Sequence, residues 1–536
     1  MPYTAPIHRS PRPRLLAAAV LAGVFALCLR WPALGQSPVG ELDRAPAPLL
    51  AVGDVTATSA LLWVQGDRAG TLLVELVAAK GGNGPPRRFQ RVVGEETDFT
   101  AKILVSDLEP GTLHRWRASM VAAAAADGEP RQDAPASPES AGEVLGATAV
   151  GSFRTAPDPY AAAPVALVWG GDLGGQNVCR DAQWGFEVFD AIADRKPELF
   201  VGVGDMIYAD GLCEAIGRYG NTQIPASFGK AADLRGFRAH WRYSRADPGL
   251  RRLLAETAYF PVWDDHEVLN DFGPLHDTRT EPPYRDGEHL LPLGLAAMLE
   301  QNPIAEHKRT PQRLYRSVRW GQHLELLLLD TRQYRDANAA PDTAQRPKTM
   351  LGREQLTWLK DRLAKSDATW VVVASSVPLS IPTGSAEQGG DGWTDFDGKG
   401  GFQRELGGIL AHAAANGRDR LLFISADVHY AAGFRYRPFA DKPGFVPHEL
   451  ITAPLSASIA GGREPDSELG AERLFLHAPD SAEALRDYAQ ARQWLGFGEL
   501  RIDADGELTA TLRNIDGDPL YGLRLTPLSP VRVAAR

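Results

Sequence analysis

The chain has 536 residues, of which 44% are hydrophobic, so it is too long for one ordinary domain and can bury a sizeable core. Its formal net charge at pH 7 is -10. Domains that bind nucleic acid usually carry a strongly basic surface instead. The composition therefore predicts two or more domains and excludes a specific nucleic-acid-binding face.

The first 36 residues have the layout of a secretory signal peptide. Basic residues between His8 and Arg14 precede the apolar stretch Leu15–Leu29, and small residues follow around Gly35. The apolar stretch is shorter than the roughly 20 residues that cross a bilayer, which disfavours the alternative of a membrane anchor. We expect residues 1–36 to be removed and the exported protein to be periplasmic or secreted. We also expect it to be a monomer with no later transmembrane segment.

Two cysteines, Cys179 and Cys213, remain after this cleavage. An oxidising compartment permits a disulfide between them. They follow Asp172 and Asp205 by seven and eight residues, so their loops would meet if the two strand ends do. Two unpaired thiols are the alternative, and a cysteine that binds a metal is a third interpretation.

From Leu49 to Thr155, short alternating apolar runs are separated by turn signals, which is typical of a β-sandwich. The segment Leu108–Arg117 resembles the turn and strand of fibronectin type III modules. Residues 121–144 are rich in Ala, Pro, Ser, Asp and Glu and cannot build a core, so they indicate a surface loop. We predict an all-β domain of the fibronectin III or immunoglobulin type over residues 45–156.

The pattern changes after residues 156–159, where two prolines interrupt both helix and strand. Strands now alternate with segments such as 184–192 and 356–363, whose apolar residues recur at helical spacing. This alternation predicts a layered α/β domain over residues 160–526. Residues 496–512 return to β alternation and predict a C-terminal hairpin on that domain.

Several predicted strands of the second domain run directly into acidic residues or histidine. The carboxyl ends of strands are where ligands bind in open α/β sheets. Gathered carboxylates and imidazoles there indicate a metal site, although each strand end taken alone is also compatible with a simple turn or a solvated loop. The residues at these ends are Asp172, Asp205 with Tyr208, Asp265 with His266, and Asp427 with His429.

In this order the residues resemble the calcineurin-like metallophosphoesterase superfamily and, within it, the alkaline phosphatase D (PhoD-like) family. The resemblance runs from about Leu49 to Thr526 and includes the segments Asp330–Arg335 and Met350–Gln355. It implies an α/β layered metallophosphoesterase domain behind an all-β domain. It also implies hydrolysis of phosphate monoesters or diesters by a metal-bound hydroxide.

The resemblance assigns the first of two metal positions. Asp205 would bridge two ions, and Asp172, Tyr208 and His429 would complete a site for Fe³⁺. A tyrosine phenolate suits a ferric ion. Many members of the family carry Cys where this chain has Asp172, so iron affinity and redox behaviour are expected to differ here.

Asp265 and Asp427 would serve the second position. Asp265 stands where the superfamily usually has Asn, and Asp427 where it usually has the first His of Gly-His-x-His. Hard anionic oxygen ligands favour Ca²⁺ over Zn²⁺. Iron and calcium are therefore the expected cofactors, with Zn, Mn or Mg as alternatives.

The catalytic groups expected from the resemblance are His266 and Arg332. His266 would protonate the leaving oxygen or stabilise the transition state, unless it is simply hydrogen-bonded beside the cluster. Arg332 would hold a substrate phosphate with its planar fork, and Arg335 would do so instead or pair with a carboxylate. Further residues expected to line the pocket or hold another calcium ion are Asn270, Asp271, Asp391 and Asp395.

A different function class also fits the acidic cluster. An exported binding protein would use its sandwich to recognise a polymer and hold only structural calcium. A structural calcium site needs oxygen ligands rather than an imidazole, so His266 beside Tyr208 disfavours this alternative. A serine hydrolase built on Ser375 or Ser376 is disfavoured more strongly, because no Gly-x-Ser-x-Gly elbow surrounds either residue.

Overall fold

The computed structural model describes residues 48–78, 86–122, 143–273, 290–385, 389–396 and 400–527. The predicted signal peptide and most of the predicted loop 121–144 lie outside these residues. In the part of the chain that is described, no helix has the length and apolar character that a bilayer crossing requires.

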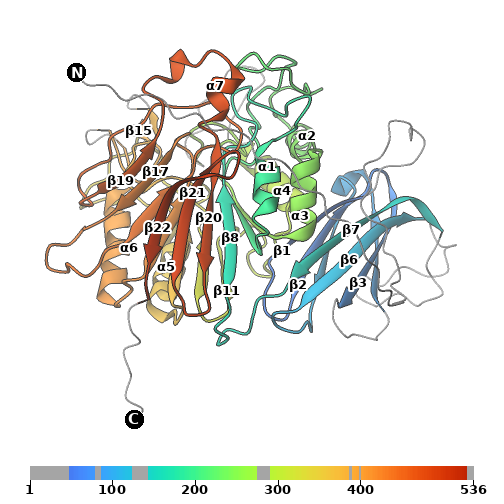
Figure 1. The fold of residues 1–536 in the computed structure, drawn as a ribbon, viewed down its shortest axis with the longest axis horizontal. Helices are drawn as coiled ribbons and strands as arrows, with labels where there is room; N and C mark the ends of the chain where they lie inside the picture. Colours follow the sequence, from blue (N-terminus) through green and yellow to red (C-terminus); the bar gives the residue numbers. More distant parts are fainter. Residues whose placement is uncertain are drawn as a thin grey trace, which may run out of the picture. The chain divides into compact units, whose positions relative to one another are not determined.

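Two large mixed sheets form the centre of the protein (Figure 1). The nine-stranded sheet has the order β22 (Pro519–Leu525), β21 (Leu508–Asn514), β20 (Gly496–Ile502), β8 (Val165–Gly170), β9 (Leu199–Val203), β10 (Ala258–Val262), β1 (Leu49–Gly53), β2 (Ala60–Gln65) and β5 (Thr100–Val105). The seven-stranded sheet has the order β11 (Arg316–Trp320), β12 (Leu324–Leu328), β13 (Trp370–Ala374), β16 (Leu421–Ser425), β18 (His448–Ile451), β17 (Ala431–Arg435) and β19 (Glu472–His477).

Side chains alternate along the strands and so divide the protein into layers. Leu167 of β8 and Leu326 of β12 share one core between the two sheets. Val168 of β8 packs instead with one set of helices, and Leu327 of β12 with another. The order of layers is therefore helix, sheet, sheet, helix, which agrees with the predicted α/β class. The first set is α1 (Val188–Asp194), α2 (Leu234–Arg245), α3 (Pro248–Glu256) and α4 (Leu290–Gln301), and the second is α5 (Gly352–Lys365) and α6 (Gln403–Ala415).

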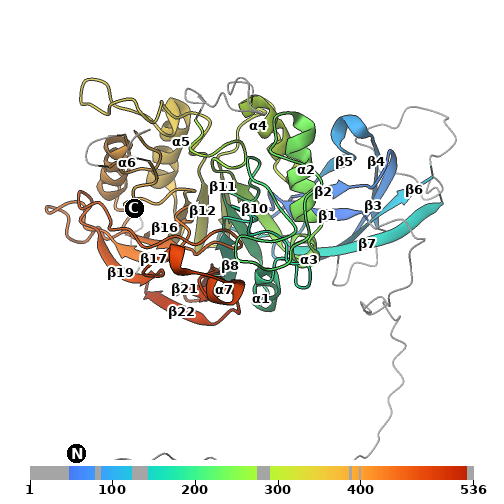
Figure 2. The same ribbon diagram turned by 90° about the horizontal axis from the view of Figure 1, so that it is seen from above.

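The region before β8 is rich in strands, as predicted, but not all of these strands form a separate sheet. Strand β1 pairs in parallel with β10, with Val52 opposite Ala258, so β1, β2 and β5 extend the nine-stranded sheet. Figure 2 shows these N-terminal strands, coloured blue to cyan, beside α2 and α3. The other four strands form a sheet of their own: β4 (Arg87–Val93), β3 (Gly70–Ala78), β6 (Leu113–Val121) and β7 (Val144–Arg154).

The C-terminal segment forms three antiparallel strands, where the sequence pattern predicted a two-stranded hairpin. Strand β20 also pairs with β8, with Leu500 opposite Leu167, so the segment extends the nine-stranded sheet at its other end. The third strand, β22, contains no fully buried residue. Its weak apolar alternation explains why the sequence pattern missed it. The remaining elements are the short helix α7 (Tyr488–Arg492) and the two-residue strands β14 (Gly384–Ser385) and β15 (Gly389–Gly390).

Candidate metal centre

The predicted site residues come together just beyond the carboxyl ends of the central strands. Asp172 follows β8, Asp205 follows β9 and Asp265 follows β10, and these three strands are parallel neighbours. Asp427 and His429 follow β16 of the facing sheet. Both sheets therefore contribute to one locus, as the strand-end pattern predicted.

The backbone at this locus is unusual. Asp172, Asp205, Asp427 and His429 all have a positive φ, between 53° and 73°. Left-handed backbone is uncommon for residues with a side chain and is found preferentially at functional sites. The neighbouring Gly204 has a φ of 104°, and a Cβ there would lie 2.6 Å from the Cβ of Asp264. The strand ends thus adopt a costly conformation that directs several polar side chains to one place.

One part of the cluster, which we call the tyrosine half, consists of Asp172, Tyr208 and His429. The Tyr208 hydroxyl lies 3.2 Å from Oδ1 of Asp172 and 3.0 Å from Nε2 of His429. Nδ1 of His429 lies 2.5 Å from the carbonyl oxygen of Ser458 and donates to it, which leaves Nε2 as the ligand atom. A carboxylate, a phenol and an imidazole therefore converge within one hydrogen-bonded group.

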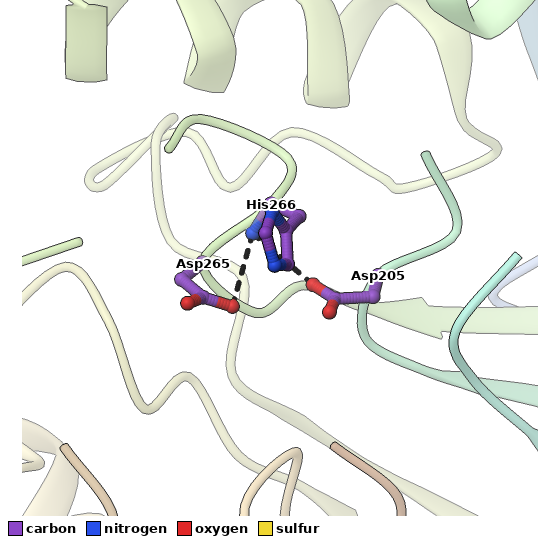
Figure 3. A group of neighbouring side chains, drawn as sticks. All are labelled: Asp205, Asp265 and His266. Atoms are coloured by element: carbon purple, nitrogen blue, oxygen red, sulfur yellow. Dashed lines mark hydrogen bonds between the residues drawn. The ribbon is translucent and has the colours of Figure 1, made fainter. Parts of the chain in front are cut away.

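The other part, which we call the carboxylate half, consists of Asp264, Asp265 and Asp427. Each offers a ligand atom within 4.8 Å of the others. Asp205 and His266 form an overlapping group with Asp265. Figure 3 shows the backbone nitrogen of His266 donating to Oδ1 of Asp205 and Oδ1 of Asp265, each over 3.1 Å.

The two halves touch each other. The backbone nitrogen of Asp427 donates to Oδ2 of Asp172 over 3.2 Å. The charges of both Asp265 and Asp172 act on Asp205. Asp205 therefore lies within electrostatic range of both halves.

The electrostatics of the cluster fit bound cations. Burial, and then the neighbouring carboxylates, hold the pKa of Asp205 and the pKa of Asp427 well above their usual range. The same two causes raise the pKa of the Tyr208 phenol. Oδ2 of Asp427 and Oδ2 of Asp264 are buried and have no hydrogen-bond partner within the described residues. A positive ion would relieve the repulsion and engage these oxygens.

His266 is oriented by Asp210, a residue to which the sequence analysis assigned no role. Its Nδ1 lies 2.7 Å from Oδ1 of Asp210 and donates to it, while Nε2 has no partner among the described residues. The ring stacks near Tyr208, with centroids 4.1 Å apart. Burial opposes the positive form, but Asp210 and Asp265 outweigh it and raise the pKa of His266 to about 9.

Glu267 ties two strand-end loops together. Its carboxylate accepts hydrogen bonds from the backbone nitrogens of Met206 at 2.7 Å, Asp264 at 2.8 Å and Asp205 at 3.1 Å. The side chain is 1% exposed, and this burial raises its pKa to about 8. Glu267 therefore supports the loops and is absent from the lining of the cavity described below.

A cavity of about 380 Å³ opens over the cluster. The predicted residues Asn270 and Asp271 line it, while Asp391 and Asp395 do not. Asp391 accepts from Thr383 at 2.8 Å and pairs with Arg332, and Asp395 lines a different hollow. The full lining among the described residues is Gln176, Asp205, Asp265, His266, Asn270, Asp271, Thr383, Gly384, Asp427, Val428, His429, Ala460 and Arg463.

Comparison with known proteins identifies the family. A model described as PhoD-like phosphatase matches residues 168–512, a range that begins with β8 and includes every predicted metal ligand. The chain belongs to the PhoD-like phosphatase family. Strands β1 to β7 lie before the matched range.

Individual relatives of this PhoD-like phosphatase are distant. Alkaline phosphatase D of Bacillus subtilis (strain 168) is 28% identical over 218 residues, which make up 37% of this chain and 36% of that protein. A solved structure of PhoD superposes with a TM-score of 0.66 at 18% identity, covering 89% of this chain and 88% of that one. The purple acid phosphatase PPD1 from yellow lupin (Lupinus luteus) gives a TM-score of 0.55 at 12% identity, covering 90% and 74%. At these identities the two structures show a shared fold.

The role predicted for Arg332 needs correction in this PhoD-like phosphatase. Arg332 was expected to hold a substrate phosphate, but its side chain is fully buried. Nε lies 2.5 Å from Asp264, and Nη1 lies 2.7 Å from Asp391. Arg335 is equally buried and bonds the backbone oxygen of Asp391, which agrees with the pairing alternative. Neither guanidinium group lines the cavity, so both support the cluster from behind. Nη2 of Arg332 and Nε and Nη1 of Arg335 are buried and have no hydrogen-bond partner among the described residues.

A disulfide joins Cys179 to Cys213, with 5.8 Å between the Cα atoms. It links the loop that follows Asp172 to the loop that carries Tyr208. Gly175, between Asp172 and Cys179, lies directly against the Tyr208 ring, because a Cβ there would be 2.4 Å from Cζ. The structure thus resolves the alternatives that the sequence left open for the two cysteines of the PhoD-like phosphatase.

Proposed function

We propose that the protein is an exported, metal-dependent phosphoesterase that hydrolyses phosphate monoesters or diesters. The observation that carries this proposal is the hydrogen-bonded contact between the tyrosine half and the carboxylate half, with Asp205 beside them in the lining of an open cavity. Family membership supports the same reaction class. Export follows from the signal-peptide layout of residues 1–36.

The donor set fits two different cations. We propose Fe³⁺ for the tyrosine half, held by Asp172, Tyr208 and His429, because a phenolate and a carboxylate suit a small, highly charged ion. We propose Ca²⁺ for the carboxylate half, held by Asp265 and Asp427, because all its ligands are oxygens. Asp205 would serve both. When bound, such a pair of ions activates water and offsets the charge that develops on a phosphate ester.

The side chains around the ions have separable tasks. His266 is our proposed proton donor to the leaving oxygen, because its side chain is part of the cavity lining and Nδ1 is committed to Asp210, which leaves Nε2 for proton transfer. Asp210 fixes the tautomer and the ring orientation. Glu267 and Arg332 keep the ligand-bearing loops in register from outside the cavity. These buried polar groups leave the cavity wall to the ligands and to the substrate.

We also propose a division of the chain. Residues 45–156 would form a fibronectin III or immunoglobulin-like sandwich, and residues 160–526 the catalytic domain. The four-stranded sheet β4-β3-β6-β7 supports the first assignment, and the helix-flanked sheets support the second. The pairing of β1 with β10 means that the two domains would share a sheet.

Hydrolysis of p-nitrophenyl phosphate and of its bis ester tests the proposed function. We expect the protein purified without added metal to contain iron and calcium and to cleave at least one of these esters. Asp205→Ala should abolish the activity, because it removes the ligand shared by both halves. Asp361→Ala is the matched control, since Asp361 is 60% exposed in a surface ion pair with Lys365.

Two outcomes would contradict the proposal. A folded, metal-loaded protein that cleaves neither ester would favour the alternative of an exported, calcium-stabilised binding protein whose sandwich recognises a polymer. Zinc as the sole metal would overturn the ligand assignment while leaving the reaction class intact. Full activity of Asp205→Ala would exclude this cluster as the catalytic centre.

A further inference from the structure

Charge is unevenly distributed around the candidate cavity. The carboxylates Asp205, Asp265, Asp271 and Asp427 line it, and Arg463 is the one Lys or Arg among the described residues that do so. The arginines that the sequence pointed to, Arg332 and Arg335, are buried behind the cluster. A substrate anion in the cavity therefore meets a single guanidinium group from the described part of the protein.

Arg463 lies at the rim of the cavity. It is exposed, whereas Asp205 and Asp265 are each only 3% exposed. The metal ligands are thus at the floor, and the phosphate that reacts belongs there, beside the cations that it requires. A guanidinium at the rim meets a different part of the substrate, namely the group that extends from the reacting phosphate towards solvent.

The rim position of Arg463 is built from both sides of the cavity. Its backbone nitrogen lies 3.2 Å from the hydroxyl of Tyr430, the residue after His429. Its Nη1 donates to the carbonyl oxygen of Pro382 over 2.7 Å, next to Thr383 of the cavity wall. The first contact holds the backbone of Arg463 against the segment after β16, and the second holds its side chain against the segment after β13.

The guanidinium keeps binding capacity in this position. It lies 5.7 Å from the centre of the Phe396 ring, which restrains its plane without using its donors. Nε and Nη2 make no hydrogen bond with any described residue. A planar fork with open N–H groups is suited to a carboxylate or phosphate.

We propose that Arg463 binds a second anionic group of the substrate, carried by the leaving group. The site would then favour phosphate esters whose alcohol or phenol itself bears a negative charge. This inference rests on the proposed phosphoesterase function of the same site. It makes Arg463 a determinant of specificity and gives it no part in the chemical step.

A matched pair of substrates tests the inference. 4-Carboxyphenyl phosphate has an anionic leaving group, and 4-carbamoylphenyl phosphate has a neutral leaving group of the same shape. Phosphate release gives kcat and KM for each. In Arg463→Gln we expect KM for the carboxylated ester to rise about 10-fold, KM for the neutral ester to change less than about 2-fold, and kcat to stay within about 2-fold for both. The KM difference should shrink as salt is added, because the group is exposed.

Two further variants secure the result. Arg463→Lys keeps the charge but loses the fork, so KM for the carboxylated ester should fall between those of the wild type and Arg463→Gln. Arg437→Gln removes an arginine that is 51% exposed and pairs with Glu472 outside the cavity, and it should leave both KM values unchanged.

The outcomes separate this inference from the function beneath it. If the wild type cleaves neither of these esters nor the bis ester of p-nitrophenyl phosphate, the proposed function fails and the inference with it. If it cleaves only the bis ester, the inference fails and the function stands. If the wild type cleaves both esters and Arg463→Gln changes both KM values equally, or neither, the role of Arg463 is refuted and the function stands. Unfolding of Arg463→Gln would also refute it, because an exposed recognition residue should be dispensable for folding.

Discussion

The two halves of the candidate centre are held in place by different means. In the tyrosine half, Tyr208 forms hydrogen bonds with Asp172 and His429. A disulfide joins the loop after Asp172 to the loop that carries Tyr208. In the carboxylate half, Asp264 and Asp265 face a buried guanidinium, that of Arg332. One half is therefore tied covalently, and the other is tied by charge.

This difference reflects the charge that each half must tolerate. The tyrosine half contains a single carboxylate, which is joined to a phenol that in turn bonds an imidazole. The carboxylate half brings three acidic side chains within 4.8 Å. Arg332 offsets part of that charge, and Asp264 and Asp391 in turn hold the pKa of Arg332 well above its usual value despite full burial. We infer that the carboxylate half depends more strongly on its cation.

The largest expected effect follows removal of Asp265. This residue belongs to every candidate metal-binding group found among the described residues. Asp265→Ala should lower kcat/KM more than about 1000-fold, or about 4 kcal/mol of transition-state stabilisation, and should release calcium before iron. Enzyme rates and elemental analysis measure the two effects. Equal loss of both metals would show that the halves are not independent.

Asp265→Asn sharpens the same comparison. It keeps the shape and one oxygen ligand but removes a negative charge. We expect retained activity with weaker calcium binding and better activation by zinc or manganese. Unchanged calcium preference would contradict the argument from ligand charge.

Loss of Arg332 should destabilise the carboxylate half selectively. Arg332→Gln leaves Asp264 buried without its cationic partner and leaves Asp391 with Arg335 alone; loss of one partner of a buried ion pair typically costs about 3–5 kcal/mol. Denaturant unfolding measures the loss, and added calcium should recover part of it by mass action. The control Arg524→Gln removes a 73% exposed arginine from its pair with Glu507 and should change stability by less than about 1 kcal/mol. A stability loss that calcium does not reduce would mean that Arg332 acts independently of the cation.

The sequence predicted which side chains gather at the strand ends better than it predicted what holds them there. Asp172 and Asp205 follow the neighbouring parallel strands β8 and β9, whose apolar runs are evident, and Asp427 follows the equally apolar β16 of the facing sheet. The pairing of Asp210 with His266 spans 56 positions, and that of Arg332 with Asp264 spans 68. Such contacts depend on loop conformations that no local pattern specifies. Loop conformation also decides where Arg332 lies. It follows a strand, as the predicted ligands do, and was expected in the cavity, but its side chain is buried behind the cluster.

Contacts between distant parts of the chain were also missed in the prediction of the fold. Alternation predicted strands before residue 156 and a helix-flanked sheet after it, and both are present. That β1 pairs with β10 could not be predicted, because pairing partners 206 residues apart leave no local signal. Turn signals identified the strands but not the sheet to which they belong.

The disulfide should matter mainly to the tyrosine half. It closes a loop between positions 34 residues apart, and loss of such a bond typically costs about 2–4 kcal/mol. The double variant Cys179→Ser with Cys213→Ser should therefore unfold at lower temperature and lose iron before calcium. Calorimetry and elemental analysis of the exported protein are the measurements. If the variant loses calcium before iron, the disulfide does not stabilise the tyrosine half.

Tyr208→Phe tests the tyrosine half with the smallest change. Only the hydroxyl is lost, while the ring keeps its place against His266 and Gly175, so stability should fall by no more than about 1–2 kcal/mol. Because the phenolate oxygen is one of the proposed iron ligands, the variant should retain calcium, lose most of its iron and lose about 10–100-fold in kcat. A variant that retains iron and activity would remove Tyr208 from the ligand set. The tyrosine half would then be a hydrogen-bonded group that supports the fold without binding an ion. Only the carboxylate half would remain as a candidate metal site.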